Sequence, residues 1–510
     1  MTGQSTARAT PSPQRLLVTV FIMMATIMQV LDITIANVSL PYMQGSLSAT
    51  LDQVSWVLTS YVVAAAVMTA PVGWLAARFG IKTLLIACVT GFTIASMLCG
   101  IAQTIEEMVL FRVLQGMFGA ALVPLAQSVM LEIYPPHRRG WAMSLWGMGV
   151  MIGPIMGPIL GGILTEYYSW RWVFFINLPV GIVTVIGLLT CMGESEGNRG
   201  LAFDWVGFTA LGIAIGALQL LLDRGEQVGW FDANEIVVMA IVSATAFYFF
   251  LAHSLTTERP FISMEIFRDR NFNVGLMFMF VCGVMLVASM ALMAPMLQGM
   301  MGYPIIDAGV LLGARGVGMG VSMLMAGRLM TVVDPRLLLF VGLSCCVASL
   351  NASIDFTPDT ATRTIAWVSM LQGFGLGLMF VPLNMIALST LPVALRTQGT
   401  AMWTLIRNLG SSVGVSIVIA NLTNKTIMMH ALLAESVTPF NQAMADPAAA
   451  MLDASTETGR ALLENLLTQQ ATIIAYANDF KLMLVMTLLC YPLVLLVRTS
   501  RRQFADTAAA

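Results

Sequence analysis

Runs of about twenty apolar residues follow one another along almost the whole chain, separated by short polar segments. A helix needs about 20 residues to cross the ~30 Å hydrocarbon core of a bilayer, where it satisfies its own backbone hydrogen bonds. Only 10% of the 510 residues are charged, whereas soluble domains carry about 25%. The pattern therefore predicts an all-α polytopic membrane protein.

The apolar runs divide into fourteen predicted spans. Their predicted bounds are 16–38, 55–77, 82–102, 107–131, 141–165, 172–192, 203–222, 235–254, 273–298, 304–327, 336–354, 364–389, 398–421 and 479–498. The first run lacks a small-residue cleavage site, so we expect it to be an uncleaved span and not a signal peptide.

Lysine and arginine predict the orientation of the spans, because cytoplasmic loops carry an excess of them. With the N-terminus inside, 16 of the 25 basic residues fall in cytoplasmic segments and 6 in outer segments. The other three, Arg112, Arg315 and Arg407, lie inside spans. Both termini are therefore expected to be cytoplasmic.

The two halves of the chain repeat each other. Leu114-Gln115-Gly116 matches Leu371-Gln372-Gly373, and the segment from Gly73 aligns with the segment from Gly327. Duplicated six-helix halves are typical of transporters. The two spans between the halves are then an insertion, which gives a 6 + 2 + 6 arrangement.

The repeat and the spans together predict how the chain divides. The predicted parts are a cytoplasmic tail 1–15, an N-terminal six-helix bundle 16–195, two inserted helices 196–258, a C-terminal six-helix bundle 259–498 that includes a large periplasmic loop 422–478, and a cytoplasmic tail 499–510.

The predicted span 141–165 carries glycines at a spacing of four. Residues four apart share one face of a helix, so these glycines form a groove in which another helix backbone can approach closely. Two prolines in the same run lack a backbone donor and are expected to bend the helix. The residues concerned are Gly149, Gly153, Pro154, Gly157, Pro158, Gly161 and Gly162.

Three other motifs accompany this run: Leu31 to Pro41 (LDITIANVSLP), Arg112 to Gly116 (RVLQG) and Gly73 to Lys82. Together with the glycine run they resemble the 14-span drug:proton antiporter family of the major facilitator superfamily, the EmrB/QacA type, and most nearly its EmrB branch. The resemblance implies the major facilitator fold and export driven by the proton gradient without a cofactor. Gly73, Arg78, Gly80 and Lys82 match the family's loop motif, but Ala77 stands where the superfamily usually has aspartate, which puts an ionic latch there in doubt.

Asp32 is the clearest acidic residue deep in a span. At 1.5 Å per residue it lies ~12 Å below Leu40, and Arg112 lies at a similar depth. Burial favours the neutral acid and a nearby arginine favours the carboxylate, so such a group can load and release a proton. We favour this role in proton coupling over the alternative, in which the pair only holds two helices together.

Two further arginines, Arg315 and Arg407, lie near the middle of their spans. If they line the substrate cavity, it should favour anionic amphiphiles over cations. The alternative is that each satisfies backbone carbonyls beside a glycine. Amide side chains in spans are further candidates for the cavity, although they can equally join helices. They are Gln29, Asn37, Gln115, Gln127, Gln372, Asn384 and Asn408.

The predicted outer segment 422–478 contains Glu435-Ser436-Val437-Thr438-Pro439-Phe440-Asn441 and a helix-like stretch at about 456–475. The E-S-V-x-P-F-N run resembles the EmrB branch in particular. That resemblance implies a periplasmic adaptor protein and an outer-membrane channel as partners, with this loop as their docking element. The loop is otherwise a passive cap.

Other classes of function find no support in the sequence. It contains no Walker loop, and its cysteines and histidines have no metal-site spacing. An enzyme is not expected, and the net charge of −2 gives no sign of a nucleic-acid partner. The sequence predicts a proton-coupled multidrug efflux transporter of the bacterial inner membrane, which exports hydrophobic or amphipathic compounds and confers antibiotic resistance. The alternatives are an exporter of one metabolite, such as a siderophore, fatty acid or lipid, and a sensor or scaffold.

Overall fold

The computed structural model describes residues 12–135, 138–195, 197–257, 260–330, 332–437 and 456–497. These residues form eighteen α-helices with short 3-10 and π turns, and they contain no strand. Twelve of the described helices are long and apolar enough to cross a membrane, and a bent pair makes thirteen. If α7, which has 29 residues, is counted as well, the number of spans is compatible with the fourteen predicted.

The helices of the N-terminal bundle are α1 (Ser12–Ser46), α2 (Leu51–Thr69), α3 (Val72–Phe79), α4 (Ile81–Ile101), α5 (Ile105–Gly119), α6 (Leu122–Ile133), α7 (Arg139–Tyr167), α8 (Trp172–Phe175) and α9 (Asn177–Cys191). The inserted pair is α10 (Trp205–Val228) and α11 (Asn234–Thr256). The C-terminal bundle holds α12 (Arg270–Pro295), α13 (Ile305–Leu329), α14 (Pro335–Ile354), α15 (Thr362–Ser389), α16 (Val393–Glu435), α17 (Glu457–Leu488) and α18 (Tyr491–Leu496).

Several spans begin where the sequence supplies a cap. Thr50 and Gln53 form a reciprocal capping box at the start of α2, and the Asp204 carboxylate caps α10. Such caps satisfy backbone N–H groups that have no partner within the helix. Pro71, which has no N–H, precedes α3, and α2 and α3 meet there at 58°.

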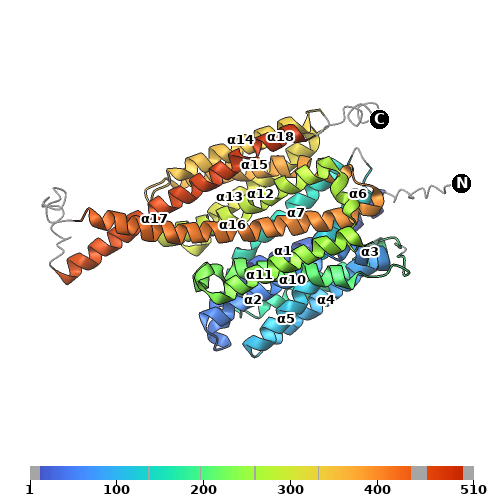
Figure 1. Ribbon diagram of the computed structural model, residues 1–510, viewed down its shortest axis with the longest axis horizontal. Coiled ribbons are helices and arrows are strands. Elements are labelled where there is room, and N and C mark those ends of the chain that lie inside the picture. The colour runs from blue at the N-terminus through green and yellow to red at the C-terminus, as the bar shows by residue number, and fades with distance from the viewer. Residues whose placement is uncertain are drawn as a thin grey trace.

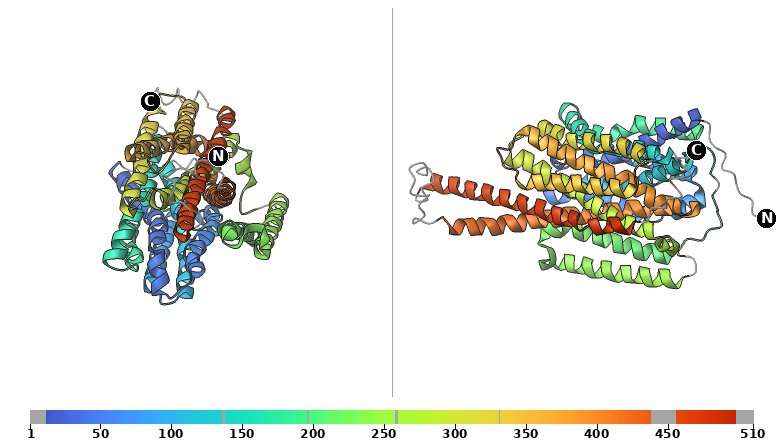
Figure 2. Two further views of the ribbon diagram at one scale, coloured as in Figure 1. Left: turned by 90° about the vertical axis from the view of Figure 1, so that its left-hand side faces the viewer. Right: turned by 90° about the horizontal axis from the view of Figure 1, so that it is seen from above.

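The two bundles lie side by side with the inserted pair at the periphery (Figures 1 and 2). We call the end where α1 begins and α18 ends the terminal face, and the opposite end the far face. At the far face α16 and α17 extend well beyond the other helices (Figure 1). The predicted span 398–421 therefore continues as helix to Glu435, and the predicted start of the last span, 479, lies within α17. The region 422–478 is thus largely a helical projection on either side of residues 438–455, which lie outside the described residues.

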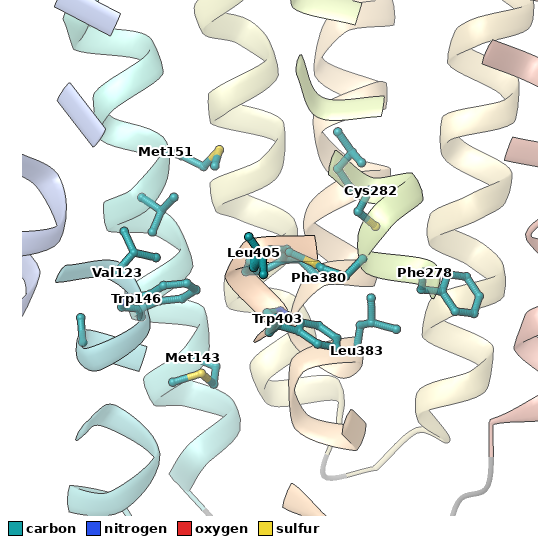
Figure 3. Packing of buried hydrophobic residues seen from close by; sticks show 14 of the residues in the cluster. Val123, Met143, Trp146, Met151, Phe278, Cys282, Phe380, Leu383, Trp403 and Leu405 are labelled. Atoms are coloured by element: carbon teal, nitrogen blue, oxygen red, sulfur yellow. The ribbon is translucent and has the colours of Figure 1, made fainter. Parts of the chain in front are cut away.

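The bundles meet closely toward the terminal face. Trp146 of α7 stacks on Phe380 of α15 with ring centroids 6.0 Å apart, within the apolar interior that Figure 3 shows. Nearer the face, the Ser128 hydroxyl lies 2.9 Å from that of Thr397. A Cβ on Gly73 would lie 2.7 Å from the Gln398 Cα atom. The structure is thus a state closed at the terminal face.

Asp204 joins the inserted pair to the C-terminal bundle. Its carboxylate accepts hydrogen bonds from the backbone N–H groups of Gly207 (2.9 Å) and Phe261 (3.3 Å), and it contacts His253 Nε2 at 2.8 Å. Partial burial acts to raise the pKa of Asp204, but these hydrogen bonds together hold it below its ordinary value.

We expect Asp204→Asn to lower the stability of the protein by about 1–3 kcal/mol, because it replaces hydrogen bonds to a charged group by weaker ones. A carboxyl group with a lowered folded pKa contributes stability above its unfolded pKa and loses it as the pH falls through the folded value. The difference in melting temperature from the wild type, measured in detergent, should therefore persist from pH 8 to pH 5 and narrow only below about pH 4. A difference that vanishes at pH 6 would contradict this account.

Candidate functional site

A fully buried ion pair lies inside the N-terminal bundle. Arg112 Nη1 of α5 donates to Asp32 Oδ2 of α1 at 2.6 Å, and both side chains are 0% exposed. Sequence counting predicted a similar depth for the two residues, and the structure brings them into direct contact. Their role in proton coupling stays a prediction.

Amide side chains surround the carboxylate. Gln115 Nε2 and Asn177 Nδ2 donate to Asp32 Oδ1 at 2.8 and 3.0 Å. Gln115 also accepts from Arg112 Nη1 at 2.7 Å, so in this structure it belongs to the ion-pair network. Asn177 in turn donates to the Ser96 hydroxyl at 2.9 Å. Asn177 and Ser96 were missed, although a polar residue inside a predicted span was a usable signal.

The guanidinium group of Arg112 is held on its other sides by α2. Its Nε donates to the Val57 carbonyl oxygen at 2.9 Å, and its Cζ lies 4.3 Å from the ring centroid of Tyr61. The remaining nitrogen, Nη2, is buried and has no hydrogen-bond partner among the residues that the structure describes. A buried charge is tolerated only when it is paired, so Asp32 and Arg112 depend on each other.

The glycine face of α7 packs against α1, the helix that carries Asp32. A Cβ on Gly153 would lie 2.6 Å from Val30 Cγ1 and 2.9 Å from the backbone nitrogen of Leu31. The Thr34 hydroxyl donates to the Gly153 carbonyl at 3.0 Å, and Gly157 contacts Thr34 as well. The predicted groove therefore receives α1 itself.

The other residues of the glycine motif differ in their surroundings. Gly149 faces the flexible end of Met23, and Gly161 approaches the Ile35 carbonyl, whereas a Cβ on Gly162 would meet nothing within 4 Å. The side chains of Pro154 and Pro158 lie outside the described residues. Only some positions of the glycine motif therefore make a close contact with α1.

The loop motif between α2 and α4 is bound by the segment that leads to the inserted pair. The guanidinium of Arg78 donates to the Leu201 carbonyl, and Lys82 Nζ lies 2.9 Å from Glu194 Oε1. The backbone N–H of Asn198 donates to the carbonyl of Ala77 at 2.9 Å. Where the superfamily's aspartate is absent, backbone contacts to this linker hold the loop.

Gly80 of the same motif has φ +85°, a left-handed conformation that side chains disfavour. Gly73 approaches the backbone of Gln398 at the start of α16. Gly73 therefore lies at the contact between the two bundles, where an added side chain would separate them.

A small cavity lies between the bundles beside Arg315. Its volume is about 30 Å³, roughly that of one water molecule in the liquid. It is lined by Met151, Leu286, Met290, Leu312, Arg315, Gly316 and Met319. A drug-sized molecule does not fit, so the cavity must open for binding.

Neither central arginine of the C-terminal bundle forms an ion pair within the described residues. Arg315, 5% exposed, donates to the Ser289 hydroxyl at 2.6 Å and to the Met285 carbonyl at 3.2 Å, and its Nε has no partner. Half-buried Arg407 lies 3.3 Å from Asn408 Oδ1. Arg315 partly fits both predictions: it lines a cavity, and it satisfies a backbone carbonyl.

Gln127 and Asn384, both predicted for the cavity, bind each other across the bundles. Gln127 Nε2 donates to Asn384 Oδ1, and Asn384 Nδ2 donates to the Phe380 carbonyl at 2.7 Å. Gln29 and Gln372 are buried, and Asn37 is exposed on α1. The seven predicted amide side chains therefore lie in different parts of the structure.

We expect Asn384→Leu to weaken the closure of the terminal face. The loss of one hydrogen bond across the bundles, worth about 1 kcal/mol, shifts the equilibrium toward an open face roughly fivefold. Spin labels at exposed Phe79 and Val332, one on each bundle, would report it as growth of the longer-distance population. An unchanged distance distribution would contradict a role for this bond in closure.

A second acid is also buried. Asp479 of α17 is 0% exposed and accepts from Asn421 Nδ2 of α16 at 2.5 Å, and its Oδ2 has no hydrogen-bond partner in the described part of the chain. Asp479 is thus a buried acid that the sequence analysis did not single out beside Asp32. Asp479 was missed because it falls at the predicted boundary of its span.

Comparison with known proteins places this architecture in a family. The model of the Major Facilitator Superfamily matches residues 22–415. The chain is 35% identical over 430 residues to the multidrug export protein EmrB of Escherichia coli K12, covering 84% of each chain. It is 33% identical over 484 residues to the fatty acid resistance protein FarB of Neisseria gonorrhoeae, covering 94% of this chain and 96% of that one.

Solved structures agree on the fold. The human organic anion transporter MFSD10 superposes with a TM-score of 0.62 at 10% identity, over 95% of this chain and 100% of that one. The proton:xylose symporter XylE superposes with a TM-score of 0.58 at 14% identity, over 93% and 95%. The predicted fold class is confirmed, and the chain belongs to the major facilitator superfamily, within the EmrB branch of its drug:proton antiporters.

Proposed function

We propose that this chain exports hydrophobic or amphipathic toxic compounds across the bacterial inner membrane in exchange for protons. The observation that carries the proposal is the buried pair of Asp32 and Arg112, because an ionisable group inside a membrane usually marks an ion pathway. The EmrB relatives, multidrug export proteins by name, support export of drugs.

The surroundings of Asp32 support a specific exchange. Three donors on its oxygens, one of them a guanidinium, stabilise the ionised carboxylate, so protonation is favoured when α1 or α5 moves and Arg112 withdraws. The glycine contact with α7 provides a surface on which α1 can shift. Each inward proton contributes about 2.3 kcal/mol per 100 mV of membrane potential, with no cofactor needed.

Charge and shape support an orientation in the membrane and a set of partners. The excess of basic residues supports a cytoplasmic terminal face and a periplasmic far face. The projection of α16 and α17 then points into the periplasm and offers a docking element for an adaptor protein that leads to an outer-membrane channel (Figure 2).

Proton flux in proteoliposomes tests the proposal. Addition of a drug to the wild type should produce a proton signal, and Asp32→Asn, which keeps the shape but cannot ionise, should abolish it. Drug transport with an intact proton signal in Asp32→Asn would show that the carrier is elsewhere. No signal with any drug would favour export of one dedicated metabolite.

The charge of Arg315 supports acidic amphiphiles among the substrates, because this guanidinium lines the cavity without a carboxylate partner. The relative FarB, a fatty acid resistance protein by name, supports the same class. We expect Arg315→Gln to reduce transport of carboxylate drugs by roughly tenfold, the value of one hydrogen bond to a charged group, and to leave cationic drugs unaffected. Equal loss for both classes would point to a structural role for Arg315.

A further inference from the structure

A second and larger cavity lies between the N-terminal bundle and the inserted pair. Its volume is about 490 Å³. Helices α2, α5 and α10 line it with Trp56, Ser60, Val63, Ala64, Val67, Met68, Val109, Val113, Met117, Phe208 and Leu220. Met117 is 37% exposed, so this groove opens at the surface that faces the lipid.

The groove has the dimensions of a hydrocarbon chain. From Trp56 to Met68 it follows α2 for ~18 Å, slightly more than half of the ~30 Å core. Gly212 and Gly216 of α10 face Val67 and Val63 of α2 and leave room between the helices. Every lining side chain is apolar except Ser60, so the occupant must be apolar over nearly its whole length.

The far-face end of the groove is charged. The guanidinium of Arg224 lies 5.2 Å from the ring centroid of Trp56. It is 3.6 Å from a carboxylate oxygen of Asp52 and 3.6 Å from one of Glu235. Both distances exceed a hydrogen bond, and the Arg224 Nε atom, which faces Glu235, is buried without a hydrogen-bond partner among the described residues. This end therefore holds guanidinium N–H groups that can still donate to an anion, beside two carboxylates that attract a cation.

Ser60 adds a polar contact one helical turn deeper. Its side chain is 6% exposed, and its hydroxyl has no hydrogen-bond partner among the described residues. A buried unpaired hydroxyl is unfavourable unless a ligand satisfies it. An ester carbonyl, which lies below the phosphate of a membrane lipid, is such a ligand.

We infer that the groove binds one ethanolamine glycerophospholipid from the leaflet at the far face. Its phosphate contacts Arg224, its ammonium lies between Asp52 and Glu235, and an ester carbonyl accepts from Ser60 while one acyl chain fills the groove. A primary ammonium donates hydrogen bonds to carboxylates, which a choline group lacks the N–H bonds to do. The lipid thereby joins the inserted pair to the N-terminal bundle.

Native mass spectrometry tests this inference after reconstitution in vesicles of equal phosphatidylethanolamine and phosphatidylcholine and mild extraction. The wild type should retain one phosphatidylethanolamine in preference. Arg224→Gln should reduce retention roughly tenfold or more, and Ser60→Ala by roughly fivefold. Val113→Phe, which fills the groove, should abolish it, while Leu110→Phe, at a 58% exposed position of the same helix, should not.

Melting temperatures in lipid-free detergent show that the variants are folded. Equal retention of the two lipids by the wild type, or unchanged retention by Arg224→Gln, would overturn the inference. Displacement of the bound lipid by a transported drug, with drug transport lost in Val113→Phe, would reassign the groove to substrate.

Discussion

Replacement of Arg112 by leucine is expected to destabilise the protein by about 3–5 kcal/mol, because it leaves the Asp32 carboxylate buried without its cation. Both side chains are 0% exposed, so water cannot compensate for the loss. A penalty of this size approaches the whole stability of many domains. The variant should therefore give little folded protein in the membrane, as measured by yield and melting temperature after extraction.

The double variant Asp32→Asn with Arg112→Leu separates folding from function. It removes both charges, so most of the lost stability should return, while drug-driven proton flux remains absent. Arg171→Leu is the control, since Arg171 is a half-buried arginine whose contacts are the Ala102 carbonyl and the Trp170 ring. If Arg112→Leu folds as well as this control, the pair is not the mutually dependent unit that we infer.

The sequence predicted much of this site because depth along a helix can be counted. A rise of 1.5 Å per residue set Asp32 and Arg112 at one level, and the structure joins them. Rotation about each helix axis is not countable in this way. For that reason Gln115 was assigned to the cavity, and Asn177, which lies 145 residues from Asp32, was missed.

The sequence repeat between the two halves corresponds to equivalent helix contacts in the structure. The offset that aligns Gly73 with Gly327 also sets Tyr61 of α2 opposite Arg315 of α13. In the structure Gly116 contacts the carbonyl of Tyr61, and Gly373 contacts that of Arg315. The helix pairs are therefore equivalent, although the N-terminal half has its buried arginine on α5 and the C-terminal half on α13.

Of the projection at the far face, the sequence predicted the helix-like stretch at about 456–475, which lies in α17, but not the continuation of α16. Apolar periodicity predicts helices inside a membrane, but α16 and α17 continue into a segment whose charged residues include Lys425 and Glu464. These parts are stabilised by packing of the two helices on each other and by contacts such as His430 with Glu464 at 3.0 Å. Hydropathy therefore predicts the end of helix α16 too early and the start of helix α17 too late.

Substitution of Gly153 by alanine is expected to reduce stability by about 1–3 kcal/mol, the usual effect of overpacking. The new Cβ would lie 2.6 Å from Val30 Cγ1 and 2.8 Å from the Val30 carbonyl carbon. Because the second contact is backbone, α1 must move as a whole. That movement changes the position of Asp32, so drug-driven proton flux should fall together with the melting temperature.

Gly162→Ala is the matched control on the same helix. Nothing lies within 4 Å of its added Cβ, and alanine is favoured over glycine in a helix by about 1 kcal/mol, so this variant should be neutral or slightly more stable. Gly149→Ala should be intermediate, since it meets only the flexible end of Met23. Equal effects at all three positions would mean that the glycines act through the flexibility of α7, and unequal effects in this order would mean that they act through the approach of α1.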